Sequence, residues 1–272
     1  MIRKLKIYLP FVSVGIQETT VYKANWFFRI LGNSIGCFVS YFLWDAVYIS
    51  SQRKSLHGFT LPEMSVYIFL MFLTTTVIYS EGIYSVGEEI RTGAIAMRIV
   101  KPVSFSSSFL FYEIGKKAMT TYLIIPVIIV AVELFRTAIV GTIEFKINCF
   151  FLYILSCLLS YLINFFFNIS FGFIAFFTKN IWGTNMMKNT VVGFLSGSTI
   201  PFTFLPDSFE KALSFLPFAS LNYTPVMIYL GIYEGKTLLF YLCLQVFWLF
   251  IFFLISKWLW KISIKYLCIQ GG

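Results

Sequence analysis

The chain has 272 residues, of which 58% are hydrophobic, 20% are aromatic and only 12% are charged. A charged share about half that of an ordinary soluble domain cannot cover the surface of a soluble protein of this size, so the composition excludes a soluble globular enzyme, a disordered chain and a disulfide scaffold. The net charge of +9 would suggest a nucleic-acid partner in a soluble protein, but in an integral membrane protein it indicates the orientation of the chain.

The amino-terminal segment, residues 1–24, begins with basic residues and continues with a short apolar run that contains Pro10 and Gly15. The run lacks a convincing small-residue cleavage site, so we expect no removable signal peptide. The mixture of polar and apolar residues from 12 to 23 favours a segment that lies along the cytoplasmic interface. An unstructured basic leader is the alternative.

A membrane-spanning helix needs about 20 mostly apolar residues. Seven stretches without Asp, Glu, Lys or Arg are candidates, and they are 30–44, 64–80, 118–132, 147–178, 189–206, 212–233 and 237–256. The stretch 212–233 contains Pro217 and Pro225, which would interrupt a continuous helix. We therefore expect residues 206–233 to form a re-entrant or surface-lying pair of short helices and the other six stretches to span the membrane.

The distribution of Lys and Arg also favours six spans over seven. With six spans and both termini in the cytoplasm, most basic residues lie inside, whereas a seventh span would move the three lysines near the carboxyl end outside and weaken that bias. The chain shows no internal repeat and no low-complexity linker. We therefore predict an all-α membrane protein with a single transmembrane domain over residues 1–272.

Acidic residues near the predicted spans are candidates for function, because a charge in lipid is costly. Asp45 lies in the first span region, Glu81 closes the second span, and Glu113 and Glu133 flank the third. Each lies close to a predicted interface, where it could reach headgroups or pair locally, so the sequence leaves their roles open. No series of acids crosses the mid-membrane as a proton relay would, which weakens the case for a secondary transporter.

The residues needed for catalysis or nucleotide hydrolysis are missing. The single histidine, His57, lies in a short external loop, so neither a Ser–His pair nor a histidine metal cluster is favoured. The sequence contains no phosphate loop of the form G-x-x-x-x-G-K-[ST]. We therefore expect a non-catalytic chain without a cofactor or metal of its own.

The connection between the second and third spans, residues 87–104, is amphipathic. It begins with two acids and ends with basic residues before a proline, an order that predicts a short helix with its acids at the positive end of the helix dipole. Its isoleucines could face the bilayer or a partner while its basic residues face solvent, so we predict a docking helix; an ordinary positive-inside loop is the alternative. The candidate docking residues are Glu88, Glu89, Arg91, Thr92, Gly93, Arg98, Lys101 and Pro102.

A second conspicuous segment follows the fifth predicted span. The chain leaves that span through Gly197 and Pro201, and Pro206-Asp207 begins a short helix that ends near Pro217. We expect the Asp207 carboxylate to cap this helix. Its face of Phe209, Leu213 and Leu216 is typical of a helix lying on the outer membrane surface.

Taken in order, these segments resemble the permease subunits of type-2 ABC exporters, and more narrowly the bacterial permeases of this length that work in pairs with a separate ATPase. The pieces that carry the resemblance are LWDAVY at 43–48, IRTGAIAMRIVKPVS at 90–104, SG…IP…FLP…LPF from 196 to 218, YTP at 223–225 leading to Leu230-Gly231, and the terminal Tyr266…Gln270-Gly271-Gly272. The resemblance covers nearly the whole chain.

The resemblance implies six helices, a cytoplasmic coupling helix after the second span and two short external helices before the sixth. It further implies a bacterial cell membrane and a second permease, identical or related. The partner would be a dimer of ABC ATPase subunits, which would bind ATP and magnesium and contact Glu88 to Pro102. The cargo could be a drug, an antimicrobial peptide or a lipid-like molecule. A stand-alone secondary transporter or channel and an intramembrane enzyme are the competing interpretations.

Overall fold

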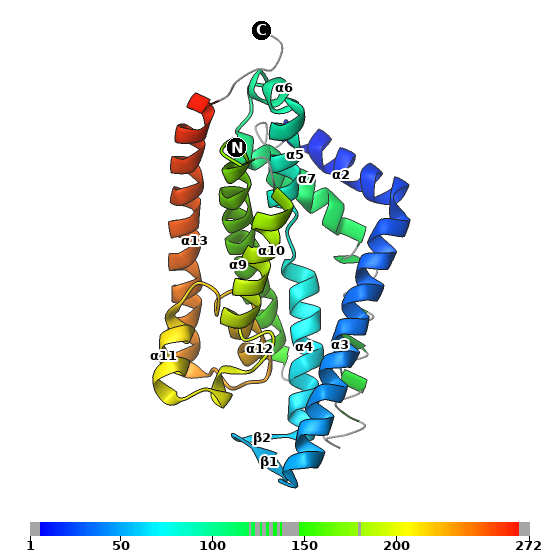
Figure 1. Cartoon of the computed structure of the whole chain (residues 1–272), viewed down its shortest axis with the longest axis vertical. Helices are drawn as coiled ribbons and strands as arrows, with labels where there is room; N and C mark the ends of the chain where they lie inside the picture. The colour runs from blue at the N-terminus through cyan, green and yellow to red at the C-terminus, as the bar shows by residue number, and fades with distance from the viewer. Residues whose placement is uncertain are drawn as a thin grey trace.

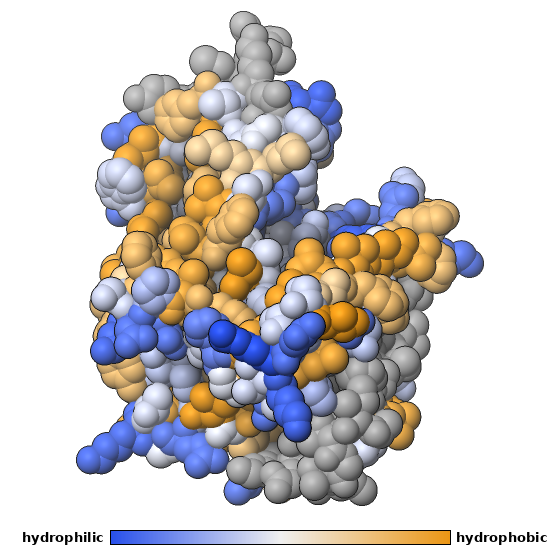
Figure 2. Space-filling model, turned by 60° about the horizontal axis from the view of Figure 1, so that its bottom comes forward, coloured by the Kyte–Doolittle hydropathy of each residue, from blue (hydrophilic) through white to orange (hydrophobic). Residues whose placement is uncertain are grey.

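A computed structural model describes residues 6–119, 121–122, 126, 129–130, 133–134, 137, 147–178 and 181–266 of the chain. Its long helices stand side by side in a bundle that is elongated along one axis (Figure 1). Hydrophobic residues cover much of the visible surface, and hydrophilic residues gather on the end that comes forward in Figure 2. An apolar exterior of this kind suits a bundle surrounded by lipid.

Four of the described helices are long and apolar enough to cross a membrane. They are α3 (Lys23–Ser51), α4 (Leu61–Ile78) with its continuation α5 (Gly82–Thr92), α9 (Ile147–Gly172) with the 3₁₀ turn η2 (Phe173–Phe176), and α13 (Gly235–Ser263). These helices contain or closely match the predicted spans 30–44, 64–80, 147–178 and 237–256. The chain is therefore an all-α multi-pass membrane protein, apart from one small hairpin described below.

The two remaining predicted spans have different outcomes. The stretch 118–132 lies mostly outside the described residues. The stretch 189–206 does not form the predicted helix. The observed helix α10 lies earlier, over Ile181–Leu195, and the chain then turns at Gly197, whose φ is +72°. Pro201 follows and cannot continue a helix, which explains why the helix lies earlier in the sequence than predicted. At about 22 Å, α10 is shorter than a bilayer core, so the total of six spans stays a prediction.

The amino-terminal helix α2 (Leu9–Val21) lies against α7 (Phe105–Met119), and the chain bends sharply from α2 into α3 (Figure 1). The helices touch backbone to backbone at Gly15 and Gly115. A Cβ on Gly115 would lie 2.2 Å from the Val12 carbonyl oxygen, and one on Gly15 would lie 2.2 Å from the Tyr112 carbonyl oxygen. Residues 9–21 are therefore a docked helix and not an unstructured leader.

The opposite end of the bundle carries a two-stranded antiparallel hairpin, β1 (Ser55–Leu56) and β2 (Phe59–Thr60), which was not predicted. His57 and Gly58 form its turn with positive φ angles, and His57 is exposed. Thr60 and Glu63 then form a capping box at the start of α4. The hairpin thus connects α3 to α4, which begins the second span.

Residues 206–233 contain two short helices, as predicted, α11 (Asp207–Phe215) and α12 (Tyr223–Tyr229). The expected cap is wrong, because Pro206 is the N-cap residue and no side chain caps the helix; Asp207 is the first helical residue. Helix α11 is exposed, with Phe209 63% accessible, whereas every residue of α12 is buried against α9 and α4. The 3₁₀ turn η3 (Phe202–Phe204) precedes α11, and η4 (Ile264–Tyr266) follows α13.

Buried apolar side chains form two main clusters along the bundle. One joins α4, α9 and α12 near the hairpin end, and the other joins α5, α7 and α9 at the opposite end, where the short helix α6 (Ile95–Ile99) lies. The second span is interrupted between these clusters. Polar groups replace the apolar packing there, and this is the region that positions the candidate site.

Candidate functional site

The second span is broken at Tyr79, Ser80 and Glu81. Tyr79 has an extended conformation with φ −51° and ψ 136°, so α4 ends at Ile78 and α5 starts afresh at Gly82. A break at this depth frees backbone carbonyls that lipid cannot satisfy. Side chains from neighbouring helices supply the missing donors: Lys117 Nζ lies 2.6 Å from the Val77 oxygen, and Asn164 Nδ2 lies 2.8 Å from the Ile78 oxygen.

Ion pairs tie the break to three other helices. The Glu81 carboxylate accepts from Arg29 of α3 and, at 2.6 Å, from Lys116 of α7. Lys116 also reaches Glu18 of α2 at 3.0 Å, and the Tyr112 hydroxyl donates to the same carboxylate. Lys116 therefore bridges carboxylates from two other parts of the chain, and these stabilise its positive charge. We call Glu18, Arg29, Glu81 and Lys116 the ionic cluster.

A second acid, Glu113, lies beside Ser80 of the break. Glu113 of α7 is 2% accessible and accepts hydrogen bonds from Ser80 at 2.9 and 3.0 Å and from the Tyr161 hydroxyl at 3.3 Å. Lys117 lies 5.0 Å from the centre of the Tyr161 ring. Every described charge at the break therefore has a polar or aromatic neighbour, as a buried charge requires.

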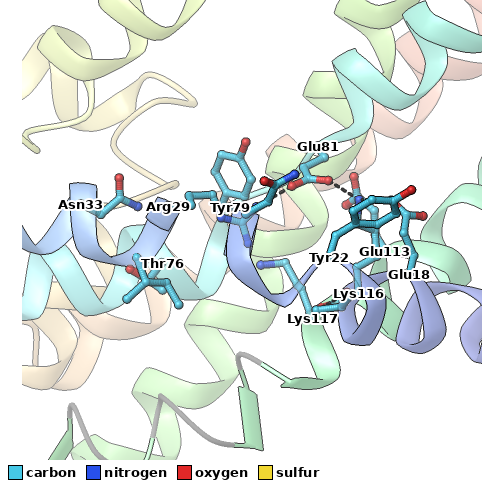
Figure 3. Close-up of a pocket in the computed structure, with 13 residues that line it drawn as sticks. Glu18, Tyr22, Arg29, Asn33, Thr76, Tyr79, Glu81, Glu113, Lys116 and Lys117 are labelled. Atoms are coloured by element: carbon cyan, nitrogen blue, oxygen red, sulfur yellow. Dashed lines mark hydrogen bonds and ion pairs between the residues drawn. The ribbon is translucent and has the colours of Figure 1, made fainter. Parts of the chain in front are cut away.

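The ionic cluster lines one side of a cavity of about 410 Å³ (Figure 3). Its wall contains three acids and three bases, so its charges are balanced. Asn33 and Thr76 lie at one end of the group drawn in Figure 3, away from Glu18 and Tyr22 at the other. Within the described part of the chain, no group of three His, Cys, Asp or Glu residues could hold a metal ion.

A chain of polar contacts connects the break to α10 on the opposite side. Lys188 donates to the Asn168 side chain, and the Asn168 Nδ2 atom lies 2.8 Å from the Asn164 oxygens. Asn164 in turn holds the Ile78 carbonyl of the break. Asn185 of α10 also reaches the Tyr84 hydroxyl of α5 at 2.7 Å. Helices α3, α7, α9 and α10 therefore all have polar links to the interrupted span.

The predicted docking segment has a different internal structure from the one expected. It is two helices rather than one, because α5 ends at Thr92 and Gly93 takes a left-handed conformation with φ +76° before α6 begins. Glu88 and Glu89 consequently lie in the last turns of α5 and not at a helix start. The prediction that these acids meet the positive end of a helix dipole is wrong.

The acids of this segment pair with its own arginines. Glu88 forms an exposed pair with Arg91 at 2.6 Å. Glu89 pairs with Arg98, whose side chain is only 15% accessible, lies 3.9 Å from the centre of the Phe109 ring and donates to Ser108 at 2.9 Å. The expectation that Arg98 faces solvent is therefore wrong, because its partners Glu89, Ser108 and Phe109 lie inside the protein.

The apolar residues of the segment divide into an inner and an outer set. Ile95 is 1% accessible, and Ile90 and Ile99 pack with it against the cluster around Val86. Met97 and Val100, by contrast, are 74% and 84% accessible. We call the exposed residues Arg91, Thr92, Met97, Val100, Lys101 and Pro102 the coupling surface.

The predicted residues near the other end of the molecule do not join this site, because α6 and α11 lie at opposite ends (Figure 1). The Gly197 carbonyl accepts a 2.6 Å hydrogen bond from Tyr67, and Pro201 and Pro217 are buried, whereas Pro206 and Asp207 are exposed. These residues shape the turn between α10 and α12. The sequence did not indicate that Arg29 and Lys116 meet Glu81, that Lys116 also meets Glu18, or that Lys188 is buried.

The sequence model of the family described as ABC-2 family transporter protein matches residues 35–271 of the chain. No curated protein and no solved structure matches it.

Proposed function

Because the chain belongs to the ABC-2 transporter family, and is thus the permease part of an ABC transporter, we propose that it is the membrane subunit of an ATP-driven exporter in the bacterial cell membrane. Permeases of this family are generally non-catalytic and work with an ABC ATPase. The proposed assembly has two permeases, identical or related, on an ATPase dimer that binds ATP and magnesium. Both termini face the cytoplasm, and the cargo is a drug, an antimicrobial peptide or a lipid-like molecule.

The observation that supports this assembly best is the position of the coupling surface. Met97 and Val100 project from the end of the bundle while the rest of α6 is fixed to α5 by the Glu89–Arg98 pair and by Ile95. Met and Arg are enriched at protein interfaces, so the exposed Met97 and Val100 beside the exposed Arg91 suit a protein contact. In this assignment the coupling surface contacts the ATPase.

The proposed motion starts at that contact. Helix α5 packs closely on α9, since a Cβ on Gly172 would lie 2.9 Å from the Val86 Cβ atom. The Glu89–Arg98 pair and Ile95 join α5 to α6, so these helices would move as one unit with the adjoining part of α9 when the ATPase dimer closes, and the break at Tyr79–Glu81 lets that unit change its angle to α4. The ionic cluster then passes the movement to α2, α3 and α7, and the ATPase biases a two-state membrane bundle.

Negative charge introduced at the coupling surface tests the assignment. We expect Arg91→Glu and Met97→Glu to abolish co-purification of the ATPase and ATP-dependent transport in vesicles. Arg53→Glu is the matched control, because Arg53 is an exposed arginine at the opposite end of the molecule. If both coupling variants retain the ATPase and transport as the control does, the docking assignment fails.

Arg98→Glu has a different expected outcome. It would place a new acid beside Glu89 and remove the cation that pairs with Glu89. The variant should therefore lose thermal stability before it loses any partner.

Transport by the purified chain without nucleotide or ATPase would instead favour a stand-alone transporter or channel.

A further inference from the structure

A second cavity, of about 390 Å³, lies at the coupling end of the bundle. It is enclosed by the segment that follows α6, the first turn of α7, the end of α9 and the last turns of α13. Its volume falls within the range of about 300–1,000 Å³ usual for small-ligand sites. It is separate from the ionic cluster, and Arg98 and Ile99 of the docking segment belong to its lining.

The charge of this cavity is unbalanced. Its described lining contains two cations, Arg98 and Lys257, and no acid. Arg98 is neutralised by Glu89 outside the cavity, so the positive charge of Lys257 remains without a counter-ion there. In the described part of the chain, the contact found for the Lys257 ammonium is the ring of Phe253, with Nζ 4.2 Å from its centre. The first cavity, with equal numbers of acids and bases, has no such excess.

Hydrogen-bond donors surround the same space. Ser106 and Ser107, in the first turn of α7, line the cavity, and their hydroxyl groups have no hydrogen-bond partner among the described residues. The lining therefore presents a free ammonium and two free hydroxyls. Together these groups match an anion that bears several acceptor oxygens, such as a phosphate.

The rest of the wall is apolar and aromatic. Trp260 stacks on Phe105 with ring centres 4.0 Å apart and planes inclined by 17°, and Leu110 and Phe166 continue the surface. Trp at a membrane boundary and Lys beside it are typical of the headgroup region. An inorganic phosphate ion would make no favourable contact with this apolar wall, whereas a lipid has both an anionic headgroup and acyl chains.

We propose that this cavity binds the phosphate headgroup of an anionic phospholipid from the leaflet at the coupling end, with Lys257, Ser106 and Ser107 as its ligands. The bound lipid would bridge α13 to the end of α6 and the segment that follows it, because Ile99 and Val103 line the same cavity as Lys257. Anionic lipid would thereby stabilise the position of the coupling segment. Basic pockets between membrane helices are known to bind such headgroups.

The test compares two lysines on one helix. The purified complex is reconstituted in nanodiscs of phosphatidylcholine with a minor fraction of phosphatidylglycerol, and the retained lipid is measured by native mass spectrometry. Lys257→Ala should reduce retention of phosphatidylglycerol about fivefold, as the loss of one headgroup cation predicts. Lys261→Ala is the matched control, because Lys261 is exposed on the same helix and does not line the cavity.

Three outcomes would overturn the proposal. They are unchanged retention in Lys257→Ala, an equal loss in Lys261→Ala, which would indicate general surface attraction, and displacement of the lipid by inorganic phosphate alone, which would identify free phosphate as the ligand. If Lys257→Ala does not fold, the double variant Ser106→Ala, Ser107→Ala keeps the test open. It should lower lipid retention without changing the elution profile of the complex, and unchanged retention would again overturn the assignment.

Discussion

The contact between Gly15 and Gly115 fixes the amino-terminal helix at the scale of single atoms. Each glycine meets the backbone of the other helix, so the neighbour cannot move aside as the end of a flexible side chain could. Small residues that allow backbones to approach are a common way of joining helices in membranes. The contact also holds Glu18 of α2 within reach of Lys116 of α7.

We expect Gly115→Ala to destabilise the protein by about 1–3 kcal/mol, because the added methyl group would overlap the Val12 carbonyl. The measurement is thermal unfolding of the detergent-solubilised chain. Gly32→Ala is the control, since Gly32 lies in the interior of α3 with no atom within 4 Å of an added Cβ. Equal effects of the two substitutions would contradict the packing of α2 on α7.

At the scale of elements, the break in the second span separates two helices that pack in different apolar clusters. Helix α4 belongs to the apolar cluster near the hairpin, and α5 belongs to the cluster near the coupling surface. Only Tyr79, Ser80 and Glu81 join them. The polar contacts at this junction hold it in one arrangement without the stiffness of a continuous helix.

Substitution of Glu81 tests the junction. Glu81→Gln removes the charge that pairs with both Arg29 and Lys116, whose side chains are 35% and 23% accessible, and should cost about 1–3 kcal/mol. We expect ATP hydrolysis by the assembled transporter to continue while transport falls. Glu210→Gln, on the peripheral helix α11, should change neither rate. Equal loss of hydrolysis and transport in Glu81→Gln would contradict a coupling role.

At this scale the sequence predicted where most of the membrane helices lie but not how residues 87–104 are built. The positions of α3, α9 and α13 followed from the apolar stretches between charges, because burial in lipid depends on composition alone. The two-helix form of residues 87–104 did not follow, since the charge order of Glu88 to Lys101 fits one helix as well as two. Only the left-handed Gly93 decides between them.

The ionic cluster could not be predicted from the sequence for a related reason. Lys116 follows Glu18 by 98 residues and Glu81 by 35, and no local pattern records such a pairing. The presence of Glu81 and Glu113 at span ends was visible in the sequence, but each was compatible with an exposed position at the headgroups. The contacts of Glu81 with α3 and α7, and of Glu113 with Tyr161 of α9, depend on how the helices pack, which composition does not determine.

For the molecule as a whole, the charged ends and the apolar sides define which residues share a side of the membrane. The hairpin with Arg53 and the start of α13 lie at one end of the bundle, and the coupling surface and the last turns of α13 lie at the other (Figure 1). The predicted six-span arrangement would place the first end outside and the second end in the cytoplasm.

Single-cysteine labelling tests this orientation. In a variant without the native cysteines, Arg53→Cys and Lys236→Cys should react with a membrane-impermeant maleimide on intact cells. Arg91→Cys and Lys261→Cys should react only after the membrane is opened. Labelling of Lys261→Cys on intact cells would contradict a cytoplasmic carboxyl end.

The docking of α2 on α7 also constrains the order in which the helices can assemble during synthesis. Residue 116 leaves the ribosome 98 residues after residue 18, a delay of about 5–20 s at usual rates of synthesis. During that interval the amino-terminal helix has no α7 to bind, and the first two spans enter the membrane before it can find its place. Helix α2 can therefore dock only after α7 has been synthesised.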